Sequence, residues 1–84
     1  MTNEQTQYIR DKFGLRIVTL RKMKDMSQAQ LAAAAGIDRT HLNRIESGKY
    51  NVTIETAYAI AQALGMTLDI IDPRLSDLAP LKTI

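Results

Sequence analysis

The sequence predicts an all-α domain of four to five helices, with a short strand near its C-terminal end as the one non-helical element. Three observations lead to this. Apolar residues recur at three- and four-residue steps, Ser, Asp and Thr stand before the helix-forming runs, and glycines follow those runs. The 84 residues have room for one domain. We expect residues 1–72 to form this domain and residues 73–84 to form a C-terminal tail.

The first expected helix runs from about Asn3 to Met23, because its apolar residues share one helix face: Ile9, Phe13, Ile17 and Leu20. A second, short helix covers residues 28–35. Ser27 stands before it, with a hydroxyl that can accept a hydrogen bond from a free amide of the first turn. Gly36 ends it, since glycine adopts the left-handed conformation without a Cβ penalty.

The third and fourth expected helices are marked in the same way. Asp38 can cap a helix that runs to Ser47 and ends at Gly48. A loop over residues 49–52 leads to Thr53, which can cap a helix from Ile54 to Leu64. Two short helices joined by a tight turn are therefore expected over residues 27–48.

After Gly65 the pattern changes to an alternation in which the apolar residues are Met66, Leu68 and Ile70, although Ile71 interrupts it. Alternation favours a strand over 66–72, with a helix as the alternative. A lone strand leaves its edges unpaired, so we expect it to pair with the same strand of a second subunit through Met66, Leu68 and Ile70. Beyond it, the Asp72-Pro73 step suits a helix start, followed by one apolar turn with Leu75 and Leu78 before Pro80.

Composition restricts the class of protein. Hydrophobic residues make up 45% and charged residues 24%, which indicates a folded chain rather than a disordered one. The chain has no cysteine, which excludes disulfides and thiolate zinc sites and favours the cytoplasm, and no segment resembles a signal peptide or a membrane span. Charge is uneven: residues 16–50 carry seven basic and three acidic side chains, whereas residues 51–84 carry two basic and four acidic ones. The basic middle suits contact with phosphates.

The segment 27–48 has the residues that a helix-turn-helix needs. Ala32 is small enough for close approach where two helices meet, and Gly36 suits the turn. The apolar residues that can hold both helices on a core are Leu31, Ile37, Leu42 and Ile45. The run SQAQLAAAAGIDRTHLNRIESGK resembles the Cro and phage-repressor (xenobiotic-response-element) family, whose pattern is S-Q-x-x-L-A, a glycine, then I-x-x-I-E-x-G. The resemblance covers about residues 13–65, with Val52 where the family often has Pro and Ala57 where it often has Leu.

The resemblance implies a DNA-binding face on the third helix, made of Arg39, Thr40, Asn43 and Arg44. Helical spacing agrees, because Leu42 and Ile45 are expected to point inward. Arginine can donate two hydrogen bonds to guanine, asparagine can pair with adenine, and the threonine methyl can contact that of thymine.

The resemblance also implies contacts with DNA phosphates from Gln28, Ser47, Lys49, Tyr50 and Arg21. Gln28 could instead be an ordinary polar residue of its helix, and Tyr50 could pack against the fourth helix. Glu46 is unusual beside DNA, and the resemblance places Arg21 next to it. We expect this pair to position the arginine toward the DNA backbone, with a plain surface ion pair as the alternative.

These residues predict a regulator that binds double-stranded DNA, a repressor that recognises a palindromic operator as a homodimer. One alternative is an antitoxin that binds a toxin and controls its own promoter, which the expected C-terminal strand and tail motivate. Another is a controller protein of a restriction-modification system. We expect no enzyme activity, no cofactor, no metal and no membrane partner. His41 is the only histidine, and we expect Asp69 and Asp72 to be solvated charges.

Overall fold

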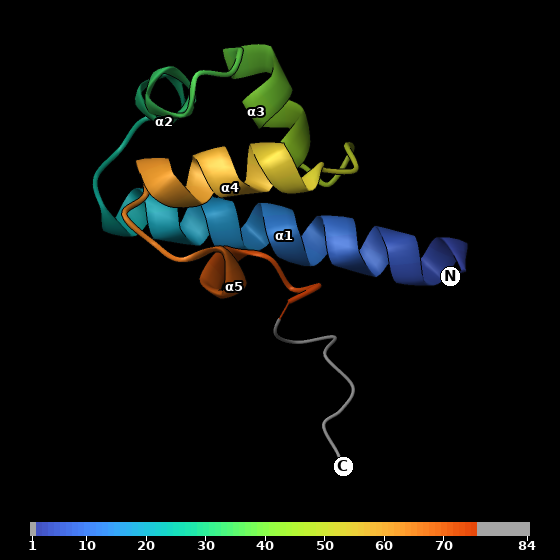
Figure 1. The fold of residues 1–84 in the computed structure, drawn as a ribbon. Coiled ribbons are helices and arrows are strands. Elements are labelled where there is room, and N and C mark those ends of the chain that lie inside the picture. The colour runs from blue at the N-terminus through green and yellow to red at the C-terminus, as the bar shows by residue number, and fades with distance from the viewer. Residues whose placement is uncertain (1, 76–84) are drawn as a thin grey trace.

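The computed structural model describes residues 2–75 of the chain, and within them all regular structure is helical. The helices are α1 (Asn3–Met23), α2 (Gln28–Ala35), α3 (Arg39–Glu46), α4 (Ile54–Ala63) and α5 (Leu68–Ile71) (Figure 1). The predicted all-α fold is confirmed. The first four helices begin and end within one residue of the predicted bounds.

Side-chain caps explain where the helices begin. The Ser27 hydroxyl accepts from the amide of Gln30, whose side chain accepts in return from the amide of Ser27. Thr53 accepts from the amide of Thr56 at the start of α4. Asp38 occupies the position before α3 with an extended backbone, but its side chain makes no capping hydrogen bond. Two of the three predicted caps therefore act through their side chains.

The core draws on all five helices of the described residues. In Figure 1, α4 and the long helix α1 run roughly parallel, α2 and α3 lie above them, and α5 lies below α1. Helix α2 packs on α3 and α4, α1 packs on α3, and α5 packs on α1 and α4. The largest fully buried apolar side chains are Phe13, Ile17, Leu31, Leu42, Ile45, Ile60, Leu64 and Ile71. Val52 and Ala57, which depart from the family pattern, are also buried in this core.

Helix α1 approaches the end of α3 closely at Gly14. A Cβ atom at Gly14 would stand 2.7 Å from the carbonyl oxygen of Ile45 and nearer still to that of Glu46. Such distances are far below ordinary contact, so only glycine allows this approach. Gly14 therefore fixes how near α3 lies to the helix that supports it.

The strand predicted for residues 66–72 is wrong, because residues 68–71 form α5. Leu68 and Ile71, three residues apart, fall on one side of a helical turn; Ile71 is fully buried and Leu68 packs against the core. Ile70 points outward and is 48% exposed. As a helix, the segment can bury this pair against α1 and α4 within a single chain. A lone strand would instead leave the backbone N–H and C=O groups along its edges without hydrogen-bond partners.

The segment after α5 also differs from the prediction. Residues 73–75 form a turn rather than the start of a helix, and Leu75 is exposed. Leu78 and Pro80 lie outside the described residues. No helix within residues 2–75 has the length and hydropathy that crossing a membrane requires.

Candidate nucleic-acid interface

The turn between α2 and α3 holds the two helices in a fixed relation. Gly36 adopts the left-handed conformation with φ 71° and ψ 29°. The amide of Ile37 then donates to the carbonyl of Ala32, at 2.9 Å, so the chain closes the end of α2 before α3 begins. Leu31 and Ala32 are buried beneath this turn. The geometry is that of a helix-turn-helix, with α3 as the second helix.

Helix α3 has one buried side and one exposed side. Leu42 and Ile45 are fully buried, whereas four polar side chains are exposed: Arg39, Thr40, Asn43 and Arg44. None of these four forms a hydrogen bond or ion pair with another of the described residues. An open hollow of about 240 Å³ is lined by Gln28 of α2 and by Arg39, Thr40 and Asn43. The structure thus brings three of the four predicted base-contacting residues together with Gln28 around one hollow, and Arg44 is exposed on the same helix, one turn after Thr40.

The carboxylate of Glu46 joins α1, α2 and α3. Arg21 Nε donates to Glu46 Oε2 at 2.7 Å, and Arg21 Nη2 donates to Glu46 Oε1 at 3.0 Å. Gln28 Nε2 donates to the same Oε1 at 2.9 Å. The Arg21 and Glu46 side chains are only 12% and 6% exposed, so this is not a surface ion pair. The pair neutralises the one acidic side chain of α3 and ties the start of α2 to the end of α3.

The same geometry limits what two of the predicted phosphate contacts can do. Arg21 Nη1 donates to the carbonyl of Met26 at 3.0 Å, so each of the three guanidinium nitrogens donates within the protein and two of the five N–H groups remain for a phosphate. The Ser47 hydroxyl donates to the carbonyl of Asn43 at 2.8 Å. A hydroxyl has a single proton, so Ser47 can donate to a phosphate only by giving up this bond.

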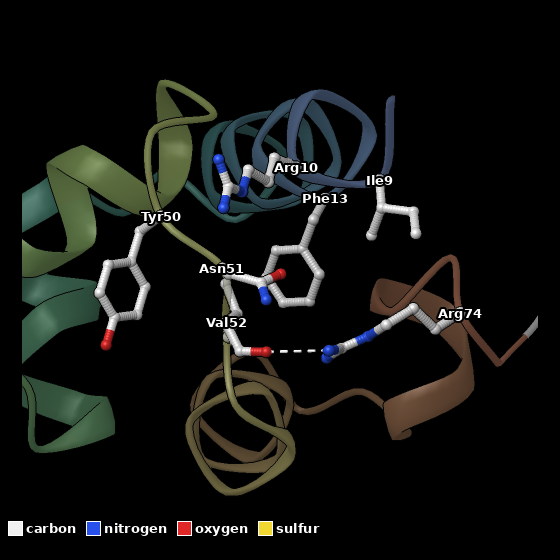
Figure 2. Close-up of a pocket in the computed structure, with 7 residues that line it drawn as sticks. All are labelled: Ile9, Arg10, Phe13, Tyr50, Asn51, Val52 and Arg74. Atoms are coloured by element: carbon white, nitrogen blue, oxygen red, sulfur yellow. Dashed lines mark hydrogen bonds between the residues drawn. The ribbon is translucent and has the colours of Figure 1, made fainter. Parts of the chain in front are cut away.

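The loop after α3 presents Lys49 and Tyr50 to solvent. The Tyr50 ring meets the ring of His41 edge-on, with 4.4 Å between centroids and 79° between planes. Tyr50 is therefore steadied by α3, the helix that precedes the loop. Its hydroxyl points away from the core residue Phe13 (Figure 2).

Two anchors of this loop were not predicted from the sequence. Gln7 Nε2 of α1 donates to the carbonyl of Gly48 at 3.0 Å. Arg74 Nη1 donates to the carbonyl of Val52 at 2.9 Å, as Figure 2 shows. Arg74 was expected in the tail, and no local pattern indicates its contact with Val52, which lies 22 residues earlier.

Asp72 is fully buried, which corrects its prediction as a solvated charge. Its carboxylate accepts hydrogen bonds from Arg74 Nε and Nη2. The hydrogen bond to Asp72, together with the charge of that carboxylate, raises the pKa of the Arg74 guanidinium against the opposing effect of burial. Among residues 2–75, no three His, Asp or Glu side chains lie close enough together to hold a metal ion.

Comparison with known proteins agrees with this geometry. The HTH_3 helix-turn-helix family model matches residues 17–71. The control protein C.MunI of a Mycoplasma species is 43% identical over 61 residues, which cover 71% of this chain and 82% of that protein. The immunity repressor protein of Bacillus phage phi105 is 40% identical over 58 residues, which cover 69% of this chain and 40% of that protein.

A solved structure is also similar. The restriction-modification controller protein C.AhdI from Aeromonas hydrophila superposes with a TM-score of 0.71 at 34% identity, covering 73% of this chain and 92% of that chain. The region matched by the family model includes the end of α1, both helices of the motif with their turn, and helices α4 and α5. The chain therefore belongs to the HTH_3 family of helix-turn-helix proteins, the Cro and phage-repressor class of DNA-binding transcription regulators, which is not a family of enzymes.

Proposed function

We propose that this protein is a transcriptional repressor that binds a palindromic operator as a homodimer and recognises base sequence through α3. The observation that carries the proposal is the exposed side of α3, where four polar side chains make no hydrogen bond with other described residues. Surface side chains that are not engaged within the fold are available to a ligand. Two of the four are arginines. Glu46, the acidic side chain of the same helix, is neutralised by its ion pair with Arg21 of α1.

Each side chain has a partner in the major groove that suits its chemistry. Arg39 and Arg44 can donate in pairs to guanine, Asn43 can pair with adenine, and the Thr40 methyl can contact thymine. Each good two-bond contact discriminates against a wrong base by about 1–3 kcal/mol. Phosphate contacts would come from residues at the two ends of the motif, namely Gln28, Lys49 and Tyr50, with Arg21 positioning Gln28 through Glu46.

Dimerisation would involve the surface where α1 and α5 meet. Leu15 is 66% exposed and Ile70 is 48% exposed. Both line an apolar hollow of about 320 Å³ whose other lining residues are Lys12, Arg16, Thr19 and Leu20. Of the three residues predicted for the interface, Met66 and Leu68 are partly buried against the core and Ile70 is the most exposed, so Ile70 is the residue on which the proposed interface mainly rests. A partner at this surface leaves α3 free, because α5 and α3 lie on opposite sides of α1 in Figure 1.

The test of base recognition is selection of bound duplexes from a random pool at fixed salt. We expect the wild type to enrich a palindrome whose half-site centres lie about one helical turn apart, roughly 34 Å. Arg44→Ala should relax one base position in each half-site. Arg44→Lys is the matched control for charge, because it keeps the attraction to phosphate but loses the planar fork, and it should relax the same position. Enrichment of no sequence, with binding that only weakens as salt rises, would refute the proposal.

The test of dimerisation is sedimentation of the wild type and of Ile70→Asp at micromolar concentration. We expect a dimer for the wild type and a monomer for the variant, since a buried unpaired charge opposes association. Ile54→Asp is the matched control, because Ile54 is 46% exposed and lies on α4. A monomeric wild type would refute this part of the proposal.

A second candidate function is control of a restriction-modification system, which the similarity to C.MunI and C.AhdI favours. A methyltransferase or nuclease gene beside this one, and a promoter of that operon that responds to the protein in a reporter assay, would support it. For the antitoxin alternative, the expected C-terminal strand is the helix α5, and the tail that also motivated it lies beyond the described residues from residue 76 on. Co-purification of a second chain encoded next to this one would support it.

A further inference from the structure

The loop between α3 and α4 is held at both ends by side chains from distant parts of the chain. Gln7 holds the carbonyl of Gly48, and Arg74 holds the carbonyl of Val52. Lys49 and Tyr50, which lie between these two points, are exposed. The backbone that carries the proposed phosphate contacts is therefore fixed before any ligand arrives.

Arg74 is in turn fixed by Asp72. Nε donates to Oδ1 at 2.8 Å, Nη2 donates to Oδ2 at 2.6 Å, and the backbone amide of Arg74 donates to Oδ1 at 3.0 Å. Asp72 is fully buried and follows α5 directly, so its carboxylate is anchored in the core. The third nitrogen of the guanidinium remains available for Val52, and it is the one that donates to that carbonyl.

Only arginine can make this connection. Its guanidinium carries donors on three nitrogens in one rigid plane, so it can bind a carboxylate with two of them and a carbonyl with the third. A lysine at the same position would keep the charge beside Asp72, but its single nitrogen cannot reproduce the fork. The geometry of the loop therefore depends on the guanidinium and not on the charge alone.

We propose that Arg74, held by Asp72, is a positioning residue that sets the loop so that Lys49 can reach a DNA phosphate. The inference rests on the proposed function, and it adds a residue from outside the helix-turn-helix. Arg74 does not contact DNA itself in this arrangement. In Figure 2 its guanidinium approaches Val52 from one side of the loop, whereas Tyr50 extends on the other side.

The test is a double-mutant cycle of binding to the selected operator duplex, measured by fluorescence anisotropy with Lys49→Ala, Arg74→Lys and both together. In the wild-type background, Lys49→Ala should weaken binding about fivefold and reduce the salt slope by about one. Arg74→Lys should cause a similar loss although the net charge is unchanged. In the Arg74→Lys background, Lys49→Ala should then change the affinity by less than about twofold.

Gln28→Ala is the control for the cycle, because Gln28 lies at the start of α2 and is held by Glu46 rather than by the loop. Its effect should be the same with Arg or Lys at position 74. Thermal unfolding identifies the temperature at which all variants are folded. If Arg74→Lys does not fold, the pair Asp72→Asn with Arg74→Gln replaces it, since this pair leaves no buried charge without a partner and conserves net charge.

Strong coupling between positions 74 and 49, with none between 74 and 28, supports the inference. Additive effects of Arg74→Lys and Lys49→Ala, with an unchanged salt slope for Arg74→Lys, would show that Arg74 only stabilises the fold and would overturn it. Failure of the proposed function looks different, because the wild type itself would then bind no duplex with sequence preference, before any variant is compared.

Discussion

The close approach of α1 to α3 at Gly14 predicts that Gly14→Ala destabilises the protein, although alanine is the better helix former. In a helix interior, alanine is favoured over glycine by about 1 kcal/mol. Against this, the new Cβ would lie 2.7 Å from the carbonyl oxygen of Ile45, where ordinary contact begins at 3.4 Å. To restore ordinary contact, the carbonyl oxygen of Ile45 would have to move away by several tenths of an ångström. The carbonyl oxygen of Glu46 is nearer still and would have to move further.

The size of the effect follows from what must move. The obstacles are backbone carbonyls rather than flexible side chains, and the end of α3 is tied to α1 by the Arg21–Glu46 pair. Overpacking of this kind costs about 1–3 kcal/mol, and the rigid surroundings favour the upper end. After the gain in helix propensity, the free energy of unfolding should fall by about 2 kcal/mol, and Tm should fall by about 10 °C for a domain of this size.

Thermal and urea unfolding followed by far-UV circular dichroism measure this change. Met23→Ala is the matched control, because Met23 is 72% exposed on the same helix and lies outside the proposed dimer surface, and it should leave stability nearly unchanged. At a temperature where Gly14→Ala is folded, operator binding should also weaken, since α3 is displaced. A Gly14→Ala variant as stable as the wild type would refute the argument.

The remaining predictions concern the buried pair of Arg21 and Glu46, the cap of α4, and Ser47, which was predicted from the sequence to contact a phosphate. Arg21→Met should lower the free energy of unfolding by about 2–4 kcal/mol because it leaves the Glu46 carboxylate buried without its counter-ion, and adding Glu46→Leu should recover most of this. Equal urea midpoints for the single and double variants would contradict it. Thr53→Ala removes the cap of α4 and should cost about 1 kcal/mol by thermal unfolding, whereas Thr53→Ser should not; an unchanged Tm for the alanine variant would contradict this. Ser47→Ala should leave operator affinity within about twofold, because its proton is already donated within α3. A larger loss in fluorescence anisotropy would show that the hydroxyl turns to a phosphate.

The parts of the fold that the sequence predicted correctly depend on local signals. Ser27, Gly36 and Thr53 mark helix ends through interactions within a few residues, and the structure contains all three. The inward direction of Leu42 and Ile45 follows from helical spacing alone, and with it the exposed side of α3. This is why the candidate site could be placed before its surroundings were known.

The segment 66–72 was predicted wrongly because it is too short for its periodicity to decide between helix and strand. Leu68 and Ile70 share a face of a strand, whereas Leu68 and Ile71 share a face of a helix, and both patterns are present. Packing against α1 and α4 selects the second. That packing involves residues about 50 positions away, as the hydrogen bond from Arg16 to the carbonyl of Ile70 illustrates, and no local pattern contains it.

Gly14 and Arg74 could not be assigned a role for the same reason. A glycine inside a helical pattern has no local explanation until the carbonyls of α3 are placed against it. Arg74 belongs to the site only because folding brings Val52, 22 residues earlier, within 2.9 Å of its guanidinium. Residues that hold a site from behind are fixed by the tertiary arrangement, whereas residues that face its ligand follow from helical period.

The division of α3 into a buried side and an unengaged side has a consequence for how such a protein can change over time. Leu42, Ile45 and Glu46 hold the helix, and the four exposed positions contribute nothing to that task. Substitutions at exposed positions of this kind usually alter stability by no more than about 0.5 kcal/mol. Under the proposed function, operator preference can therefore drift, or be redirected in a library randomised at residues 39, 40, 43 and 44, without drawing on the small stability margin of a domain of this size.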